Sequence, residues 1–238
     1  MLHVTSEVGR LRAVLVHEPG SEVDQMVPAM MEELLFDDIL FGERVREEHR
    51  RFRRLMQLLG IEVLGARDLL AETLKLEAAR EWLFEIVLPE LPPVIRGRLR
   101  TADPSNLVAT LVEGARSEEA GGIAVEDLYA LPPIPNWCFQ RDPQVVLGDG
   151  AVMAAMATPA RWREAILSRV IFRFYPRLSG ATLLDPLMPE RERPLFLGLH
   201  RPRLEGGDVL VLSPEVVAVG ISERTNTVAV ECLTRSLG

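Results

Sequence analysis

The chain has 238 residues and a net charge of −8, and 47% of its residues are hydrophobic. This composition is typical of globular proteins, and the length suffices for one large domain or two small ones. The acidic balance gives no basic surface, so we predict no nucleic-acid partner. No apolar run approaches the roughly 18 residues that span a membrane. The start of the chain lacks a signal-peptide pattern, and we expect no membrane partner. The low cysteine count predicts a reducing, cytoplasmic location.

The first 70 residues show strand and helix patterns in turn. The run "LRAVLVHEPG" (11–20) is apolar and ends at Pro-Gly, which predicts a strand and a turn. Residues 41–60 carry apolar side chains at three- and four-residue steps and end at Gly60, where a C-terminal cap belongs. They are predicted to form a helix, and "IEVLGARDLL" (61–70) a strand. We assign residues 1–70 to a first module.

Residues 71–130 differ and are predicted to form a small helical insertion. Charged stretches rich in leucine and alanine are broken by "PELPP" and "ADPSN", as expected for several short helices. Asp103 and Ser105 are both suitable N-cap residues for the helix that follows the second break. The proline-rich "LPPIPN" (131–136) marks the end of the insertion.

The strand pattern returns in residues 131–238, which we assign to further modules. Residues 144–156 contain two apolar runs joined by Gly-Asp-Gly, which predicts a hairpin. A helix is expected to begin near Pro159. A second hairpin is predicted in 204–226, followed by another helix. The chain ends where the next strand of a module is expected, so we expect the last module to be cut off.

Two stretches of this part share a pattern. One runs from Asp142 to Arg161 and the other from Glu205 to Arg224, and each begins with an acid and ends with an arginine. Each contains two apolar runs around a turn and is followed by a predicted helix. Repeated ββαβ modules favour a propeller-like array, in which corresponding acids converge on one cavity. The alternative is a chance match between the alternating strands and helices of an ordinary α/β protein.

Converging carboxylates raise each other's pKa unless a cation compensates them. A guanidinium is such a cation, because it stays protonated and pairs with a carboxylate through two hydrogen bonds. Arg161 and Arg224 would suit a carboxylate at the other end of the ligand, and arginine has both ends. Each residue also has a simpler interpretation: Asp142 as a turn residue, Glu205 as a surface acid, and both arginines as exposed residues at helix starts.

The same residues carry a resemblance to a family. The chain resembles arginine deiminases, which belong to the guanidine-modifying superfamily and have the pentein fold, a five-fold α/β propeller. The resemblance covers essentially the whole chain through the segments "SEVGRLRAVLVHEPG", "ELLFDDIL", "LPPIPNWCFQRDP", "ATPAR", "LEGGDVL" and "GISERTN". It implies an α/β pentein propeller of ββαβ modules, incomplete in this chain, with an inserted small helical domain.

The resemblance also implies roles for individual residues. Asp142 and Glu205 would be the catalytic acids that hold the substrate guanidinium, with Glu205 helping proton transfer. Arg161 and Arg224 would bind the substrate carboxylate. The pocket would be lined by Leu35, Asn136 and Phe139, and Asp208 would support the site from behind. The implied reaction converts L-arginine and water to citrulline and ammonia through a covalent cysteine intermediate, without a metal or an organic cofactor.

The chain departs from the family at the reacting groups. The family's catalytic histidine lies in a His-x-Asp sequence and its nucleophilic cysteine near the C-terminus. None of the histidines here (His3, His17, His49 and His200) precedes an aspartate by two positions. Cys138 is expected in a strand as a small buried residue, and Cys232 in a helix facing the core. The two cysteines give neither a disulfide framework nor a cysteine-rich metal site.

We therefore expect a truncated arginine deiminase that is inactive on its own. Two alternatives stay open. One is a non-catalytic relative that binds a guanidino ligand or a partner. The other is a different guanidine-modifying enzyme, an amidinotransferase or a dimethylarginine hydrolase. A homo-oligomer and a separately encoded C-terminal part are the protein partners left open.

Overall fold

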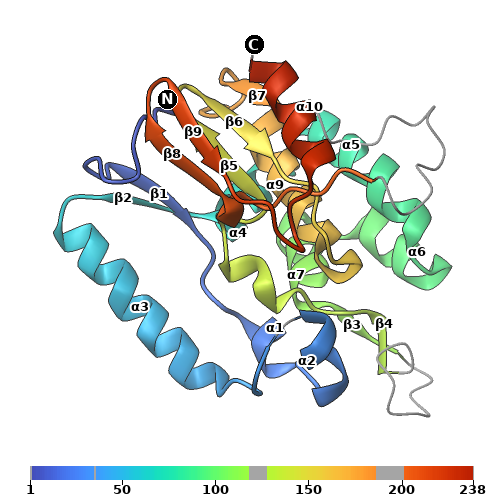
Figure 1. Ribbon diagram of the computed structural model, residues 1–238. Coiled ribbons are helices and arrows are strands. Elements are labelled where there is room, and N and C mark those ends of the chain that lie inside the picture. Colours follow the sequence, from blue (N-terminus) through green and yellow to red (C-terminus); the bar gives the residue numbers. More distant parts are fainter. Residues whose placement is uncertain (1, 35, 118–127, 186–200, 238) are drawn as a thin grey trace. The chain divides into compact units, whose positions relative to one another are not determined.

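The computed structural model describes all residues except 1, 35, 118–127, 186–200 and 238 (Figure 1). The chain divides into two compact units, residues 11–139 and residues 1–10 with 140–238. The predicted insertion, 71–130, lies inside the first unit together with the strands and helices that precede it. The predicted domain boundaries stay a prediction. Among the described helices, none is both long and apolar enough to cross a membrane.

The 11–139 unit is mostly helical. Its one parallel strand pair among the described residues joins β1 to β2 across α3. The elements in chain order are β1 (Ala13–Val16), α1 (Ser21–Asp24), α2 (Pro28–Leu34), α3 (Gly42–Leu58), β2 (Glu62–Gly65), α4 (Ala66–Thr73), α5 (Glu77–Val87), η1 (Leu88–Glu90), α6 (Pro93–Thr101), α7 (Pro104–Glu113), β3 (Ala115–Arg116), β4 (Tyr129–Leu131) and η2 (Pro135–Cys138).

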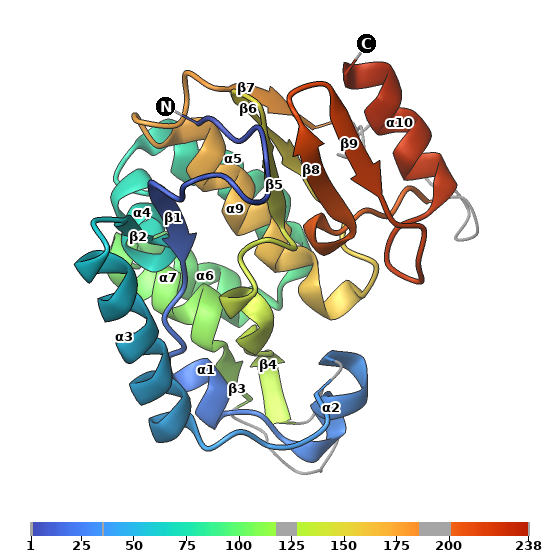
Figure 2. The same ribbon diagram turned by 60° about the vertical axis from the view of Figure 1, so that its left-hand side comes forward.

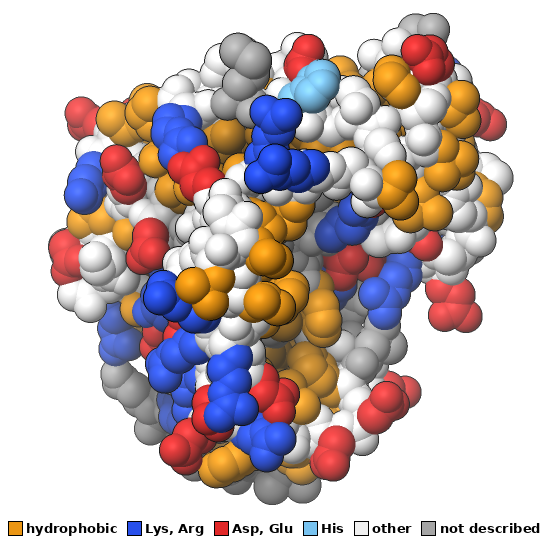
Figure 3. All heavy atoms as spheres, turned by 90° about the vertical axis from the view of Figure 1, so that its left-hand side faces the viewer, with side chains coloured by type: hydrophobic (Ala, Val, Ile, Leu, Met, Phe, Trp, Pro, Cys, Tyr) orange, Lys and Arg blue, Asp and Glu red, His pale blue; other side chains and the backbone are white. Residues whose placement is uncertain are grey.

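One prediction for this unit was wrong in detail, and another was confirmed. The strand predicted at 61–70 ends at Gly65, because β1 offers only four residues for pairing, and the rest of the run begins α4. The helix predicted at 41–60 is present as α3, but its apolar residues Phe52, Leu55 and Leu59 are exposed. Among the described residues of α3, only Gly42 and Met56 are buried. Figure 3 views the molecule from the side of α3, where basic, acidic and hydrophobic side chains lie together.

The structure selects Asp103 as the cap of α7. Its Oδ1 accepts hydrogen bonds from the amides of Ser105 (3.0 Å) and Asn106 (3.1 Å). We expect Asp103→Ala to lower the free energy of unfolding by about 1 kcal/mol, because these two amides lose their acceptor. Urea denaturation followed by circular dichroism measures the change. Ser105→Ala, in the first turn of the same helix, is the control, and an equal loss in both variants would argue against the cap.

The second unit contains a complete ββαβ module. The predicted hairpin is confirmed: β5 (Gln144–Leu147) and β6 (Gly150–Met153) are antiparallel. The chain then passes through η3 (Pro159–Arg161) and α9 (Trp162–Phe174) and returns as β7 (Thr182–Leu184), which is parallel to β6. The predicted helix near Pro159 is thereby confirmed, with one short turn before α9.

The last elements repeat the first part of this module. They are η4 (Gly206–Asp208), β8 (Val209–Ser213), β9 (Val216–Val219) and α10 (Thr227–Leu237). β8 and β9 form the second predicted hairpin, and α10 lies beside them (Figure 2). Apolar side chains of α10, β8 and β5 share one buried cluster, which includes Ala229, Leu233, Val209 and Val145. This cluster fixes the segment before β8 against the segment before β5.

Candidate functional site

Two acidic residues lie where these neighbouring segments meet. Asp142 stands just before β5, and Glu205 stands just before η4. The amide of Gly206 donates to the carbonyl oxygen of Asp142 (3.0 Å), so the two segments are joined through their backbones. The Glu205 side chain is 2% exposed, and its Oε1 accepts a hydrogen bond from the amide of Ala157 (3.2 Å). Its backbone amide donates to the hydroxyl of Thr225 (3.2 Å).

The two glycines of "EGGD" allow this close approach. A Cβ on Gly206 would lie 2.0 Å from the carbonyl oxygen of Arg141, and one on Gly207 would lie 2.9 Å from Oδ1 of Asp142. The Arg141 side chain adds a brace, because it donates to the carbonyl oxygens of Gly206 (3.1 Å) and Val209 (2.6 Å). Side chains at these positions would push the acids apart, which gives a physical reason for the glycine pair.

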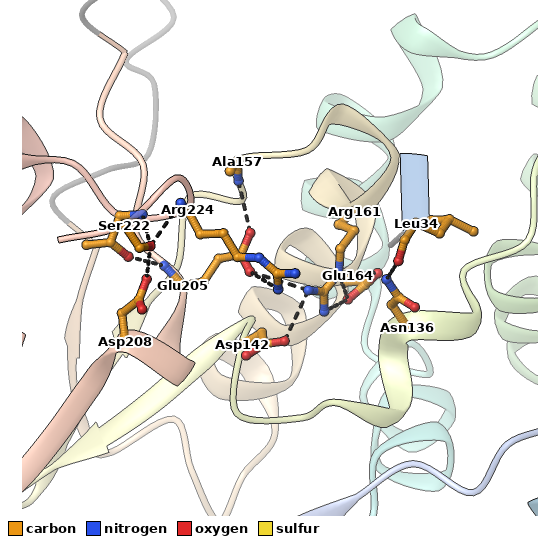
Figure 4. Close-up of polar contacts among 11 residues, drawn as sticks. Leu34, Asn136, Asp142, Ala157, Arg161, Glu164, Glu205, Asp208, Ser222 and Arg224 are labelled. Atoms are coloured by element: carbon orange, nitrogen blue, oxygen red, sulfur yellow. Dashed lines mark hydrogen bonds and ion pairs between the residues drawn. The ribbon is translucent and has the colours of Figure 1, made fainter. Parts of the chain in front are cut away.

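The guanidinium of Arg161 bridges the two acids (Figure 4). Its Nη1 lies 3.0 Å from Oδ2 of Asp142 and 3.4 Å from Oε2 of Glu205. Burial alone would lower the pKa of Arg161, but the carboxylates around it raise that pKa above its ordinary value. The side chain is only 3% exposed, so Arg161 is not the exposed helix-start residue of the simpler interpretation.

A third carboxylate, Glu164, holds the other edge of the same guanidinium. It lies one turn further along the chain, on α9, with a fully buried side chain. Its Oε2 is 2.8 Å from Nη2 of Arg161, and its two oxygens are 3.1 and 3.2 Å from Nε. Burial raises the pKa of Glu164 to about 7, although Arg161 acts in the opposite direction. Sequence reasoning missed this residue, although the i, i+3 spacing of Arg161 and Glu164 in "ARWRE" is a signal that could have found it.

Arg224 approaches Glu205 from the loop before α10. Its Nη1 lies 3.2 Å from Oε2 of Glu205, and its side chain is 41% exposed. The hydroxyl of Ser222 shapes this loop by accepting hydrogen bonds from the amides of Arg224 (3.0 Å) and Thr225 (3.2 Å). The same hydroxyl donates to Oδ2 of Asp208 (2.8 Å). Asp208 thus supports the loop that carries Arg224.

A surface pocket of about 410 Å³ opens onto this cluster. Acidic side chains dominate its wall, with one arginine among them; the lining residues are Asp142, Glu205, Gly207, Asp208, Ser222, Glu223 and Arg224. Such a wall favours a cationic ligand. Among the described residues, no group of histidine, cysteine and acidic side chains has an arrangement that could hold a metal ion.

Comparison with known proteins identifies the family of the chain. A family model described as arginine deiminase matches residues 32–238. The chain belongs to the arginine deiminase family. It is 36% identical to the curated arginine deiminases of Clostridium perfringens and Listeria monocytogenes, over 99% of its own length. It is 35% identical to that of Limosilactobacillus fermentum. The chain spans 59–60% of the length of these relatives.

A solved structure shares the fold of this member of the arginine deiminase family. It is SxtG, an amidinotransferase from Microseira wollei in the saxitoxin biosynthetic pathway. The TM-score is 0.54 and the sequence identity 16%, and the match covers 99% of this chain and 59% of SxtG. The predicted mixed α/β fold is confirmed at this level.

The other predicted pocket residues of this arginine deiminase family member lie in the 11–139 unit. Asn136, in η2, is buried, and its side-chain amide donates to the carbonyl oxygen of Leu34 (2.9 Å). Phe139 directly follows η2 and is 52% exposed. Leu35 lies outside the described residues. The structure therefore brings Asp142, Arg161, Glu205 and Arg224 into contact, with Asp208 behind them.

The cysteines and histidines have varied surroundings. Cys138 lies in the 3-10 turn η2 rather than in the predicted strand, because the proline at the start of η2 favours a turn. Its side chain is partly buried. Cys232 packs against the apolar cluster under β8, as predicted for a core-facing residue. His3 is exposed. His17 is buried, and its Nε2 lies 2.8 Å from Oε1 of the buried Glu22. Burial lowers the pKa of His49. His49 is partly buried, and His200 lies outside the described residues.

Proposed function

We propose that Asp142, Glu205, Arg161 and Arg224 form the binding site for free L-arginine in a protein of arginine deiminase type. One observation supports this most: Asp142 and Glu205 already share one guanidinium, that of Arg161, at 3.0 and 3.4 Å. Their spacing therefore suits a guanidino ligand. Glu205 also contacts a second guanidinium, that of Arg224, at 3.2 Å on the pocket side.

In the proposed complex, the guanidinium of the ligand pairs with Asp142 and Glu205, and its carboxylate pairs with Arg161 and Arg224. The reaction served by this site is the hydrolysis of arginine to citrulline and ammonia. The family relationship supports it, and the acidic wall of the pocket suits a cationic substrate. We further propose that the ββαβ module belongs to a pentein propeller.

We expect Asp142→Asn to weaken the binding of L-arginine by about tenfold or more, because a charge-assisted hydrogen bond is replaced by a neutral one. Isothermal titration calorimetry with the 238-residue chain measures the dissociation constant. Asp149→Asn is the matched control, since Asp149 lies in the β5–β6 turn with a side chain that is 76% exposed. The proposal fails if the unmodified chain does not bind arginine, or if both variants bind it equally.

We also propose that this chain alone binds arginine without converting it. Hydrolysis by covalent catalysis needs a thiolate beside the guanidinium carbon and a group that activates water. Cys232 is packed under β8, and no histidine in the sequence belongs to a His-x-Asp pair. Incubation of the purified chain with arginine should therefore yield no citrulline. Citrulline that disappears in Cys138→Ser would contradict this expectation.

A further inference from the structure

Glu164 differs from the other two carboxylates around Arg161. Asp142 and Glu205 both line the pocket, whereas the Glu164 side chain is fully buried on α9. The three carboxylates also differ in which edge of the Arg161 guanidinium they contact. The Nη1 corner of Arg161 meets Asp142 and Glu205, and the Nε–Nη2 edge meets Glu164. Among the described contacts, Arg161 thus has two partners that line the pocket and a further one, Glu164, in the protein interior.

A guanidinium ligand that enters the pocket finds both acids already occupied. Oε2 of Glu205 already accepts hydrogen bonds from both Arg161 and Arg224, so a further guanidinium there adds repulsion between cations. The ligand therefore has to replace the Nη1 corner of Arg161 at Asp142 and Glu205. Without Glu164, the buried Arg161 would exchange two carboxylates for the single carboxylate of the ligand, and an incompletely compensated buried charge opposes the exchange. Glu164 removes this obstacle only while it carries a negative charge and keeps its contacts with Nε and Nη2.

We propose that Glu164 is a positioning residue, which anchors and neutralises Arg161 so that a ligand guanidinium can take over Asp142 and Glu205. The inference rests on the proposed function and extends it, because Glu164 itself does not touch the ligand. It makes the charge of a fully buried carboxylate a requirement for binding in the pocket. An uncharged side chain of the same shape leaves Arg161 competing with the ligand.

The ionisation of Glu164 falls in a range that experiments can cover. Burial raises the pKa of Glu164 to about 7, and the charged groups that act on it are Arg161, Asp142 and Glu205, together with Arg163, whose pKa responds to Glu164 in turn. Above this pKa Glu164 is charged and the exchange is favoured. Below it Glu164 is protonated and Arg161 stays on the pocket acids, so arginine binds more weakly as the pH falls.

The test is calorimetric titration of the 238-residue chain and of Glu164→Gln with L-arginine, at about 1.5 pH units on either side of the pKa of about 7. At the higher pH we expect the unmodified chain to bind about tenfold more tightly than the variant, within the usual range of coupling between two groups. At the lower pH the two affinities should converge to within about twofold, because protonation gives Glu164 the charge of glutamine.

Glu231→Gln is the matched control. Glu231 pairs with Arg235 on the surface of α10 and does not line the pocket, so its removal should leave the affinity and its pH dependence in place. The inference is overturned if Glu164→Gln binds like the unmodified chain at the higher pH, or keeps the same pH dependence. Failure of the unmodified chain to bind arginine at any pH is a different result, which overturns the proposed function as well.

A second measurement needs no Glu164 variant and covers the case in which Glu164→Gln does not fold. The Nε–H nuclear magnetic resonance signal of Arg161, assigned with Arg161→Lys, reports on its bond to Glu164. We expect this signal to shift with pH around 7 and to persist when arginine is added, because Nε stays bonded to Glu164. A signal that does not respond to pH in this range, or that is lost on addition of arginine, overturns the inference.

Discussion

Asp185→Ala is expected to lower the free energy of unfolding by about 3–5 kcal/mol, because it leaves a buried arginine without its carboxylate. Arg169 on α9 is only 4% exposed, and its Nε and Nη2 lie 2.8 and 2.7 Å from the two oxygens of Asp185. The same guanidinium donates to the carbonyl oxygen of Ala154 (2.9 Å), just after β6. Arg169 therefore ties α9 to the chain beyond β6 and beyond β7, and it holds the ββαβ module together.

Urea denaturation measured by circular dichroism gives the change, and amide hydrogen exchange in α9 shows where it occurs. Glu231→Ala is the control, since Glu231 pairs with Arg235 on the surface of α10 at 3.3 Å, with both side chains mostly exposed. Exposed pairs of this kind contribute about 1 kcal/mol or less. If Asp185→Ala costs no more than Glu231→Ala, Arg169 does not have the structural role described above.

The local part of the second unit could be predicted because short-range signals determine it. Gly-Asp-Gly between two apolar runs is a hairpin signal, and the β5–β6 pair follows it. The matched acid and arginine at the ends of both stretches also have a counterpart in space. Arg161 contacts Asp142, Arg224 contacts Glu205, and Arg161 reaches across to Glu205. Sequence spacing pointed to this cluster because both stretches have the same order of strands.

Other features depend on contacts that are distant in sequence. The contacts of Arg161 are one example: we expected its charge to face a ligand carboxylate, but in the structure it pairs with the acids themselves. The face of α3 is another. Arg46 and Arg53 of this helix pair with Asp24 and Glu18, so its inner side is built partly from ion pairs that apolar spacing alone does not reveal.

Gly206→Ala is expected to weaken arginine binding by about 100-fold, because even a shift of about 1 Å can cost that much where geometry decides the interaction. The new methyl group would lie 2.0 Å from the carbonyl oxygen of Arg141 and 3.3 Å from that of Gln144, so backbone has to move. The movement separates Glu205 from Asp142 and breaks the pair that shares one guanidinium. Overpacking should also lower the free energy of unfolding by about 1–3 kcal/mol.

Calorimetric titration with L-arginine at a pH above 7 measures the first effect, and urea denaturation the second. Gly180→Ala is the matched control, because an added Cβ there meets no atom within 4 Å among the described residues. The loss of affinity for arginine has to be compared with the loss of unfolding free energy. A general loss of stability would weaken binding only in proportion to the unfolded fraction, whereas a displaced Glu205 weakens binding in the folded protein. Unchanged affinity in Gly206→Ala would show that the distance between the two acids does not control recognition.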